Sequence, residues 1–207
     1  MATLNDVKTF GGIGSILTLL GIVPSAGGIL AIIGLVMILV AVKYASDILG
    51  DPKIFNNMLY AVILGIIGLM IGIVTVVAAV LKAIGLGSVS GSFYVPALTG
   101  VTVTASTGVT VGQVTSIVAV ILLGLVAVWV CFLISSIFLR RSYTELGKRL
   151  NVGLFDTGAL LYLIGAALTI ILVGFILIFI AEVLFVIAFF SIDTQAAPQA
   201  QSARPTM

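Results

Sequence analysis

Four long stretches of the chain carry no charged residue and consist mainly of apolar side chains. They lie between Lys8 and Lys43, Lys53 and Lys82, Lys82 and Arg140, and Asp156 and Glu182. A helix rises about 1.5 Å per residue and the hydrocarbon core of a bilayer is about 30 Å thick, so about 20 apolar residues cross it once. The pattern therefore predicts an all-α integral membrane protein.

The first of these stretches, from Lys8 to Lys43, is too long for a single crossing. Pro24, Gly27 and Gly28 interrupt it. Proline lacks a backbone donor and glycine readily adopts turn dihedrals, so both residue types end helices. We therefore expect a helical hairpin here.

The next crossing has a clear start in the sequence. Gly50 can end the preceding helix, Asp51 can cap the new one, and Pro52 suits the first helical position. We expect this helix to run to about Lys82.

The segment 84–113 differs from its surroundings, because small, hydroxyl-bearing and β-branched residues dominate it. Valine alternates with threonine at 101–105 and at 109–111, which is strand periodicity. Non-helical backbone exposed to lipid leaves polar groups unsatisfied, so we expect a loop outside the membrane with a β-hairpin over residues 100–112. An isolated hairpin is marginally stable, and its valine face predicts a partner, either a second copy of the chain or an envelope protein.

Residues 114–139 predict a further helix, which we expect to end at the basic cluster of 140–149. The following apolar stretch, residues 157–192, would measure about 54 Å as one helix, so two short crossings fit better. An internal repeat supports this second hairpin: Gly14 and Gly21 are matched by Gly158 and Gly165 within Leu-rich runs. No proline marks the bend, and Gly174 is a weak candidate for it.

About six crossings place both termini and the loops at 43–56 and 140–156 on one side. That side carries eight of the nine basic residues, and the other carries only Lys82. The positive-inside rule assigns the basic side to the cytoplasm, so we expect a multi-pass cell-membrane protein with cytoplasmic N- and C-termini. Residues 1–193 then form a single membrane domain, and residues 194–207, rich in Gln, Ala, Ser and Pro, form a disordered cytoplasmic tail.

The amino-acid composition limits the environment and the kinds of functional site that we expect. Hydrophobic residues make up 61% of the 207 residues and charged residues only 8%, whereas soluble domains carry about 25% charged residues; the expected surrounding is the lipid bilayer. The chain has no histidine and one cysteine, Cys131, so we expect no His-based catalytic site, no metal and no cofactor. The net charge of +2 predicts no nucleic-acid binding.

Four segments form a further pattern: Phe10-Gly-Gly-Ile-Gly-Ser-Ile-Leu; Ile54-Phe-Asn-Asn with Leu59-Tyr-Ala and Ile63-Leu-Gly-Ile-Ile-Gly; Leu172-Val-Gly-Phe; and Ala188-Phe-Phe-Ser. In these segments the chain resembles an uncharacterised, mostly archaeal family of multi-pass membrane proteins, domain of unknown function family 996. The resemblance implies a fold and a membrane location. It implies no activity, no substrate and no catalytic residue.

Glu182 is the candidate intramembrane ionisable site, because it lies near the expected midplane of the last crossing. An ionised carboxylate there costs about 2.5–3.5 kcal/mol on insertion scales. Two interpretations stay open: a relay for protons or cations, or a protonated carboxyl that hydrogen-bonds another helix and serves packing. Its candidate neutral partners are Thr18, Thr75, Thr169, Tyr162 and Ser135.

Gly65, Gly68 and Gly72 are candidate helix-packing glycines on one helix. Small residues let helices approach closely, and the same stripe suits a homo-oligomer seam or a transport hinge. Two charged pairs, Lys43 with Asp47 and Glu145 with Arg149, have the i to i+4 spacing of helical ion pairs.

These features favour a non-enzymatic, structural or accessory component of the cell envelope. The alternative is a small transporter or channel, proton-coupled through Glu182, because transporters often contain internal repeats. An intramembrane enzyme ranks third, since such chemistry needs several convergent ionisable groups.

Overall fold

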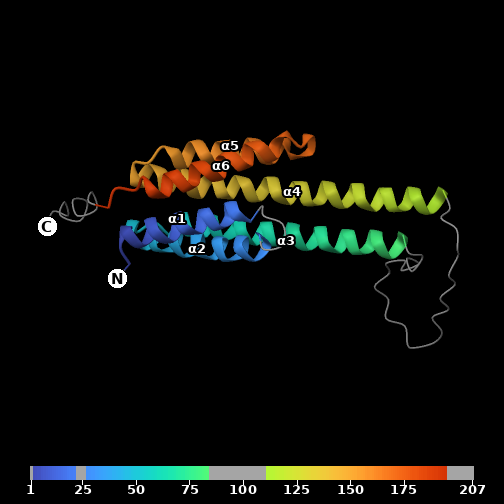
Figure 1. Ribbon diagram of the computed structural model, residues 1–207, viewed down its shortest axis with the longest axis horizontal. Helices are drawn as coiled ribbons and strands as arrows, with labels where there is room; N and C mark the ends of the chain where they lie inside the picture. The colour runs from blue at the N-terminus through green and yellow to red at the C-terminus, as the bar shows by residue number, and fades with distance from the viewer. Residues whose placement is uncertain (1, 22–26, 84–110, 195–207) are drawn as a thin grey trace, which may run out of the picture. The chain divides into compact units, whose positions relative to one another are not determined.

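The computed structural model describes residues 2–21, 27–83 and 111–194, which fold into six α-helices and one short 3-10 turn (Figure 1). The elements are α1 (Leu4–Leu20), α2 (Gly27–Leu49), α3 (Pro52–Ala83), α4 (Val111–Leu150), α5 (Leu154–Leu168), η1 (Thr169–Ile171) and α6 (Val173–Phe190). Five of these helices are long and apolar enough to cross a membrane, counting η1 with α5. The all-helical fold is therefore confirmed for the described part of the chain, and the length and composition of these five helices suit a membrane.

The junction between α2 and α3 is built as the sequence predicts. Gly50 has a φ of +66°, a left-handed conformation that ends α2 and that glycine adopts without strain. A carboxylate oxygen of Asp51 accepts a hydrogen bond from the Lys53 amide at 3.1 Å, and Pro52 is the first residue of α3. A three-residue signal thus positions the start of α3.

The prediction that the fourth helix ends at residue 139 is wrong, because α4 continues through the basic cluster to Leu150. Within the cluster, Glu145 lies 3.9 Å from the Lys148 ammonium and 3.6 Å from Arg149 Nε. These charges lie on the surface of one helix rather than in a loop. The helix stops at Asn151, whose φ is +55°.

The start of α4 also corrects an expectation. Helix α4 begins at Val111, so residues 111 and 112 are helical and do not belong to a β-hairpin. The remaining hairpin residues, 100–110, and the loop from residue 84 lie outside the described residues, as does most of the expected tail. The described residues therefore give the external β-hairpin no support.

The second helical hairpin is confirmed: residues 157–192 form two helices, α5 and α6, joined by η1. Leu172 makes the bend with a φ of +63°, and its amide donates to the Thr169 carbonyl at 3.1 Å. Gly174 lies next to the bend and serves a different purpose, because a Cβ atom there would collide with the Gly165 carbonyl. Glycine here lets the two legs of the hairpin touch.

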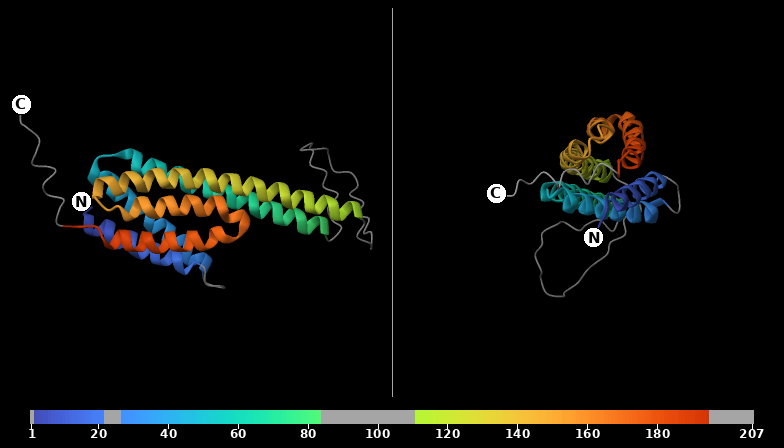
Figure 2. Two further views of the ribbon diagram at one scale, coloured as in Figure 1. Left: turned by 90° about the horizontal axis from the view of Figure 1, so that it is seen from above. Right: turned by 90° about the vertical axis from the view of Figure 1, so that its left-hand side faces the viewer.

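The chain divides into two compact units, Met1–Leu64 with Phe132–Met207, and Gly65–Cys131. In the first unit α1 packs on both α2 and α6, and α5 packs on α6 (Figure 2). An aromatic cluster forms much of its core: the Tyr143 ring centroid lies 4.4 Å from that of Phe185 and 5.6 Å from that of Phe155. The second unit pairs the C-terminal part of α3 with the N-terminal part of α4.

The two hairpins of the first unit, α1–α2 and α5–α6, share one packing pattern. A Cβ atom at Gly27 would collide with the Gly21 carbonyl, just as one at Gly174 would collide with Gly165. Further along the second legs, the same positions are buried in both hairpins: Gly34 and Ala181, Ile38 and Phe185, Ala41 and Ala188, Val42 and Phe189. The repeat predicted from the first legs therefore extends over both legs.

Candidate functional site

Glu182 lies on α6, the helix that packs against both α1 and α5. Its Oε2 atom is 3.3 Å from the Thr18 hydroxyl of α1, and that hydroxyl is 2.8 Å from the Ser15 carbonyl. A hydroxyl donates one hydrogen and accepts others. Thr18 can therefore donate to a carboxylate, or accept from a carboxylic acid while it donates to the Ser15 carbonyl.

Thr18 is thus the one predicted neutral partner for which a bond to Glu182 is found among the described residues. Three others donate to backbone carbonyls instead: Thr75 to Ile71 at 2.8 Å, Thr169 to Ala166 at 2.5 Å, and Ser135 to Ala61 at 2.7 Å. Tyr162, the fifth candidate, lies within electrostatic range of the Glu182 carboxyl.

Ser15 is a site residue that the sequence analysis missed. It is fully buried, and its hydroxyl has no hydrogen-bond partner within the part of the chain that the structure describes. Gly11, Ser15 and Thr18 share one stripe of α1, at i, i+4 and i+7. Gly11 lies against the Phe189 ring and Thr18 against Glu182, so Ser15 between them faces α6. An isolated serine in an apolar run was the available signal.

Aromatic side chains surround this polar group. Tyr143 of α4 is buried and lies within electrostatic range of Glu182. Phe185, one turn after Glu182, lies 4.4 Å from the Tyr143 ring centroid and 6.3 Å from that of Tyr162. Tyr143 was missed because it follows Arg140 and Arg141 in a segment that was expected to be a polar loop.

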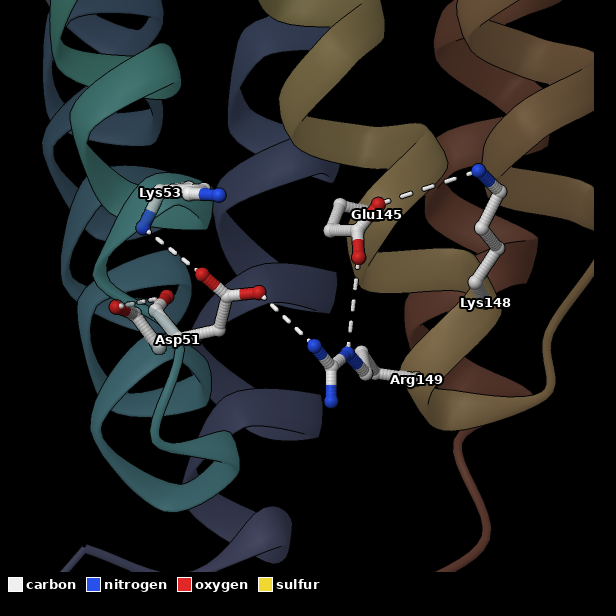
Figure 3. A network of polar contacts seen from close by, with 6 residues as sticks. Asp51, Lys53, Glu145, Lys148 and Arg149 are labelled. Carbon is white, nitrogen blue, oxygen red and sulfur yellow. Dashed lines mark hydrogen bonds and ion pairs between the residues drawn. The ribbon is translucent and has the colours of Figure 1, made fainter.

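A network of charged residues joins the end of α4 to the start of α3 (Figure 3). Arg149 lies 3.1 Å from the Asp51 carboxylate and 3.6 Å from Glu145. Both predicted pairs are confirmed, since Lys43 also contacts Asp47 at 2.7 Å. The Arg149 contact with Asp51 was not predicted, because the two residues are far apart in the sequence.

Two of the candidate packing glycines face α4 in the second unit. A Cβ atom at Gly68 would lie 3.2 Å from that of Cys131, and one at Gly72 would lie 3.6 Å from a Val128 methyl. The tightest approach in this unit is instead between Gly124 and Thr75, which the sequence analysis did not single out. Gly65 lies on the same helix, α3.

No cluster of three or more His, Cys, Asp or Glu residues that could hold a metal ion occurs in the described segments. The chemistry available at Glu182 therefore rests on one carboxyl, neighbouring hydroxyls and backbone carbonyls.

Comparison with known proteins identifies a family and a relative of this chain. Residues 30–183 match the model of a family described as a protein of unknown function, DUF996. The uncharacterized protein MJ1644 of Methanocaldococcus jannaschii is 34% identical over 189 residues, which cover 91% of this chain and 93% of that protein. No solved structure matches. By the extent of the family match and this full-length relationship, the chain belongs to the DUF996 family.

Proposed function

We propose that this protein is a small membrane transporter or channel in which Glu182 carries a proton or cation. The observation that supports the proposal most is the place of Glu182: it lies on the second repeated hairpin and contacts Thr18 of the first. Transporters built from repeats place their sites at the seam between the repeats. An ionisable residue within a membrane span is itself a functional-site hypothesis.

The local hydrogen bonds suit a group that gains and loses a proton. Thr18 has the Ser15 carbonyl at 2.8 Å and the carboxyl at 3.3 Å. After proton release, the Thr18 hydrogen turns to the carboxylate. After proton uptake, the acid donates to the Thr18 oxygen, and the Thr18 hydrogen returns to the carbonyl.

A structural or accessory role is the second candidate, and one observation favours it. The Thr18 contact joins α6 to α1, and hydrogen bonds between membrane helices stabilise packing by about 0.6 kcal/mol on average. We extend the proposal to a non-enzymatic role under both candidates, because Glu182 belongs to no cluster of three or more His, Cys, Asp or Glu residues in the described part of the chain.

Proteoliposomes under a pH gradient test the proposal, with wild type, Glu182→Gln and Glu182→Leu compared. We expect flux in the wild type and none in Glu182→Gln, because an amide keeps hydrogen-bonding capacity but loads no proton. Glu145→Gln is the control, since it removes a half-buried carboxyl on α4 that pairs with Arg149 and not with Thr18. If wild type shows no flux under any gradient, the structural role replaces the transport proposal.

We further propose a cell-membrane location with both termini in the cytoplasm, on the basis of the basic residues. Single cysteines introduced in a Cys131→Ala background test it with an impermeant maleimide. Lys148 is an exposed position for the cytoplasmic side, whereas Ser142 is unsuitable because it is fully buried. Cysteines at Ser88 and Thr107 should label from outside, and labelling at position 148 from outside would refute the orientation.

A further inference from the structure

We propose that Glu182, Thr18 and Ser15 form a binding site for a monovalent cation, with Na⁺ as the test ion, which competes with the proton for the carboxylate. The inference rests on the proposed function in that both place the transported ion at Glu182. It goes further by naming the ligands and the charge of the ion.

The site offers several oxygen atoms within one turn of α1. The Thr18 hydroxyl lies 3.3 Å from the carboxylate and 2.8 Å from the Ser15 carbonyl. The Ser15 hydroxyl is buried on the same stripe and has no partner within the described residues, an arrangement that normally destabilises a fold. Hard cations bind oxygen ligands of these kinds, namely carboxylates, hydroxyls and carbonyls.

The charge of the site selects a monovalent ion. One carboxylate supplies one negative charge, and a monovalent cation would neutralise it in a low-dielectric environment, whereas a divalent cation would leave a buried charge uncompensated. The neighbouring titratable side chains are the phenols of Tyr143 on α4 and Tyr162 on α5, whose ring centroids lie 4.4 Å and 6.3 Å from that of Phe185, one turn after Glu182. From α1, the residues are Ser15 and Thr18, which do not titrate.

The repeat shows that packing alone does not require a polar side chain at the positions of Ser15 and Glu182. In the repeat alignment, Ser15 corresponds to Ala159, which is also fully buried. Glu182 corresponds to Leu35, in a hairpin with the same burial pattern. Two of the three corresponding positions thus carry apolar side chains, and the third, which corresponds to Thr18, is Tyr162.

Labelling by dicyclohexylcarbodiimide, which attacks protonated carboxyls in apolar surroundings, tests the site on the full-length protein in detergent. Mass spectrometry measures the extent of labelling at Glu182 in NaCl and in choline chloride at equal ionic strength. We expect Na⁺ alone to protect, and the concentration for half protection to rise about tenfold per unit fall in pH once the carboxyl is mostly protonated. Equal labelling in both salts at every pH would overturn the proposal.

Two serine variants separate ion binding from packing. Ser15→Ala removes one ligand, so Na⁺ protection should weaken about tenfold, the factor that corresponds to one hydrogen-bond-sized interaction. Ser136→Ala is the control, because Ser136 is equally buried but donates to the Leu133 carbonyl at 2.7 Å. Unchanged protection in Ser15→Ala would overturn the assignment of Ser15 as a ligand.

A second measurement covers the case in which the reagent does not reach Glu182. A ligand that binds only the folded protein raises its thermal unfolding midpoint, so the midpoint should rise with NaCl, not with choline chloride, and not in Glu182→Gln. Flux that needs Glu182 without any Na⁺ effect would overturn the cation site and leave proton transport standing. Na⁺ protection of Glu182 without any flux would overturn the transport proposal and leave the cation site standing.

Discussion

Adjacent glycines at the start of α2 provide a test of the hairpin packing. A Cβ atom at Gly27 would collide with the Gly21 carbonyl oxygen and lie 2.6 Å from its carbon, whereas one at Gly28 would have no atom within 4 Å. The atoms around Gly27 are backbone, so the legs of the hairpin must separate to admit a methyl group. Overpacking lowers the free energy of unfolding by about 1–3 kcal/mol. The higher helix propensity of alanine offsets up to about 1 kcal/mol of that loss.

We therefore expect opposite signs from two neighbouring substitutions. Gly27→Ala should lower the free energy of unfolding by about 1–2 kcal/mol, whereas Gly28→Ala should raise it by up to about 1 kcal/mol. Titration with sodium dodecyl sulfate, followed by circular dichroism of the purified protein, measures both. Gly174→Ala should behave like Gly27→Ala, because Gly174 makes the equivalent contact with Gly165.

Unchanged stability in Gly27→Ala, or equal destabilisation by both neighbouring alanines, would refute contact between the legs as the reason for glycine at this position. Equal destabilisation would mean that the turn itself, and not the contact between the legs, requires glycine. A large effect at Gly27 with none at Gly174 would show that the two hairpins pack differently, against the repeat.

Three further predictions concern unfolding in the same assay. Arg149→Ala should cost less than about 1 kcal/mol despite its contact with Asp51, because the Arg149 side chain is 50% exposed; a larger loss would mean that the network acts cooperatively. Ser142→Ala should cost about 0.5–1.5 kcal/mol, since Ser142 is buried and donates to the Ile54 carbonyl at 2.7 Å. Tyr143→Leu should lower the free energy of unfolding by about 2–4 kcal/mol, because it removes a buried ring with three aromatic neighbours. If burial sets these losses, Tyr143→Leu should be the most destabilising of the three substitutions.

Much of the fold could be predicted because lipid imposes simple rules on length and charge. The stretch 157–192 had to break once, and Gly50, Asp51 and Pro52 mark a helix boundary by their backbone chemistry. The end of α4 could not be predicted in this way, because a run of charges is compatible with both a loop and a helix surface. The bend at Leu172 carried no signal either, since leucine seldom adopts a positive φ.

The candidate site was predicted only in part. Glu182 was evident as a charge in an apolar run, and Thr18 was one of five partners that composition allowed. A choice among the five candidate partners requires knowledge of which helices are in contact, and the hydropathy pattern does not give these contacts. The repeat in the second legs could not be detected in the sequence for a related reason. Ile38 and Phe185 are both buried but are different residue types, and burial becomes known only from the folded chain.

The pairing of legs within each hairpin has a consequence for the membrane topology. A hairpin returns the chain to the side from which it started, so gaining or losing one changes the number of crossings by an even amount. The hairpin α5–α6, which shares the burial pattern of α1–α2, therefore adds no net crossing after α4. The chain after α6 thus returns to the side at which α4 ends, whichever way the protein is oriented, and Glu182 occupies the position that Leu35 occupies in the first hairpin.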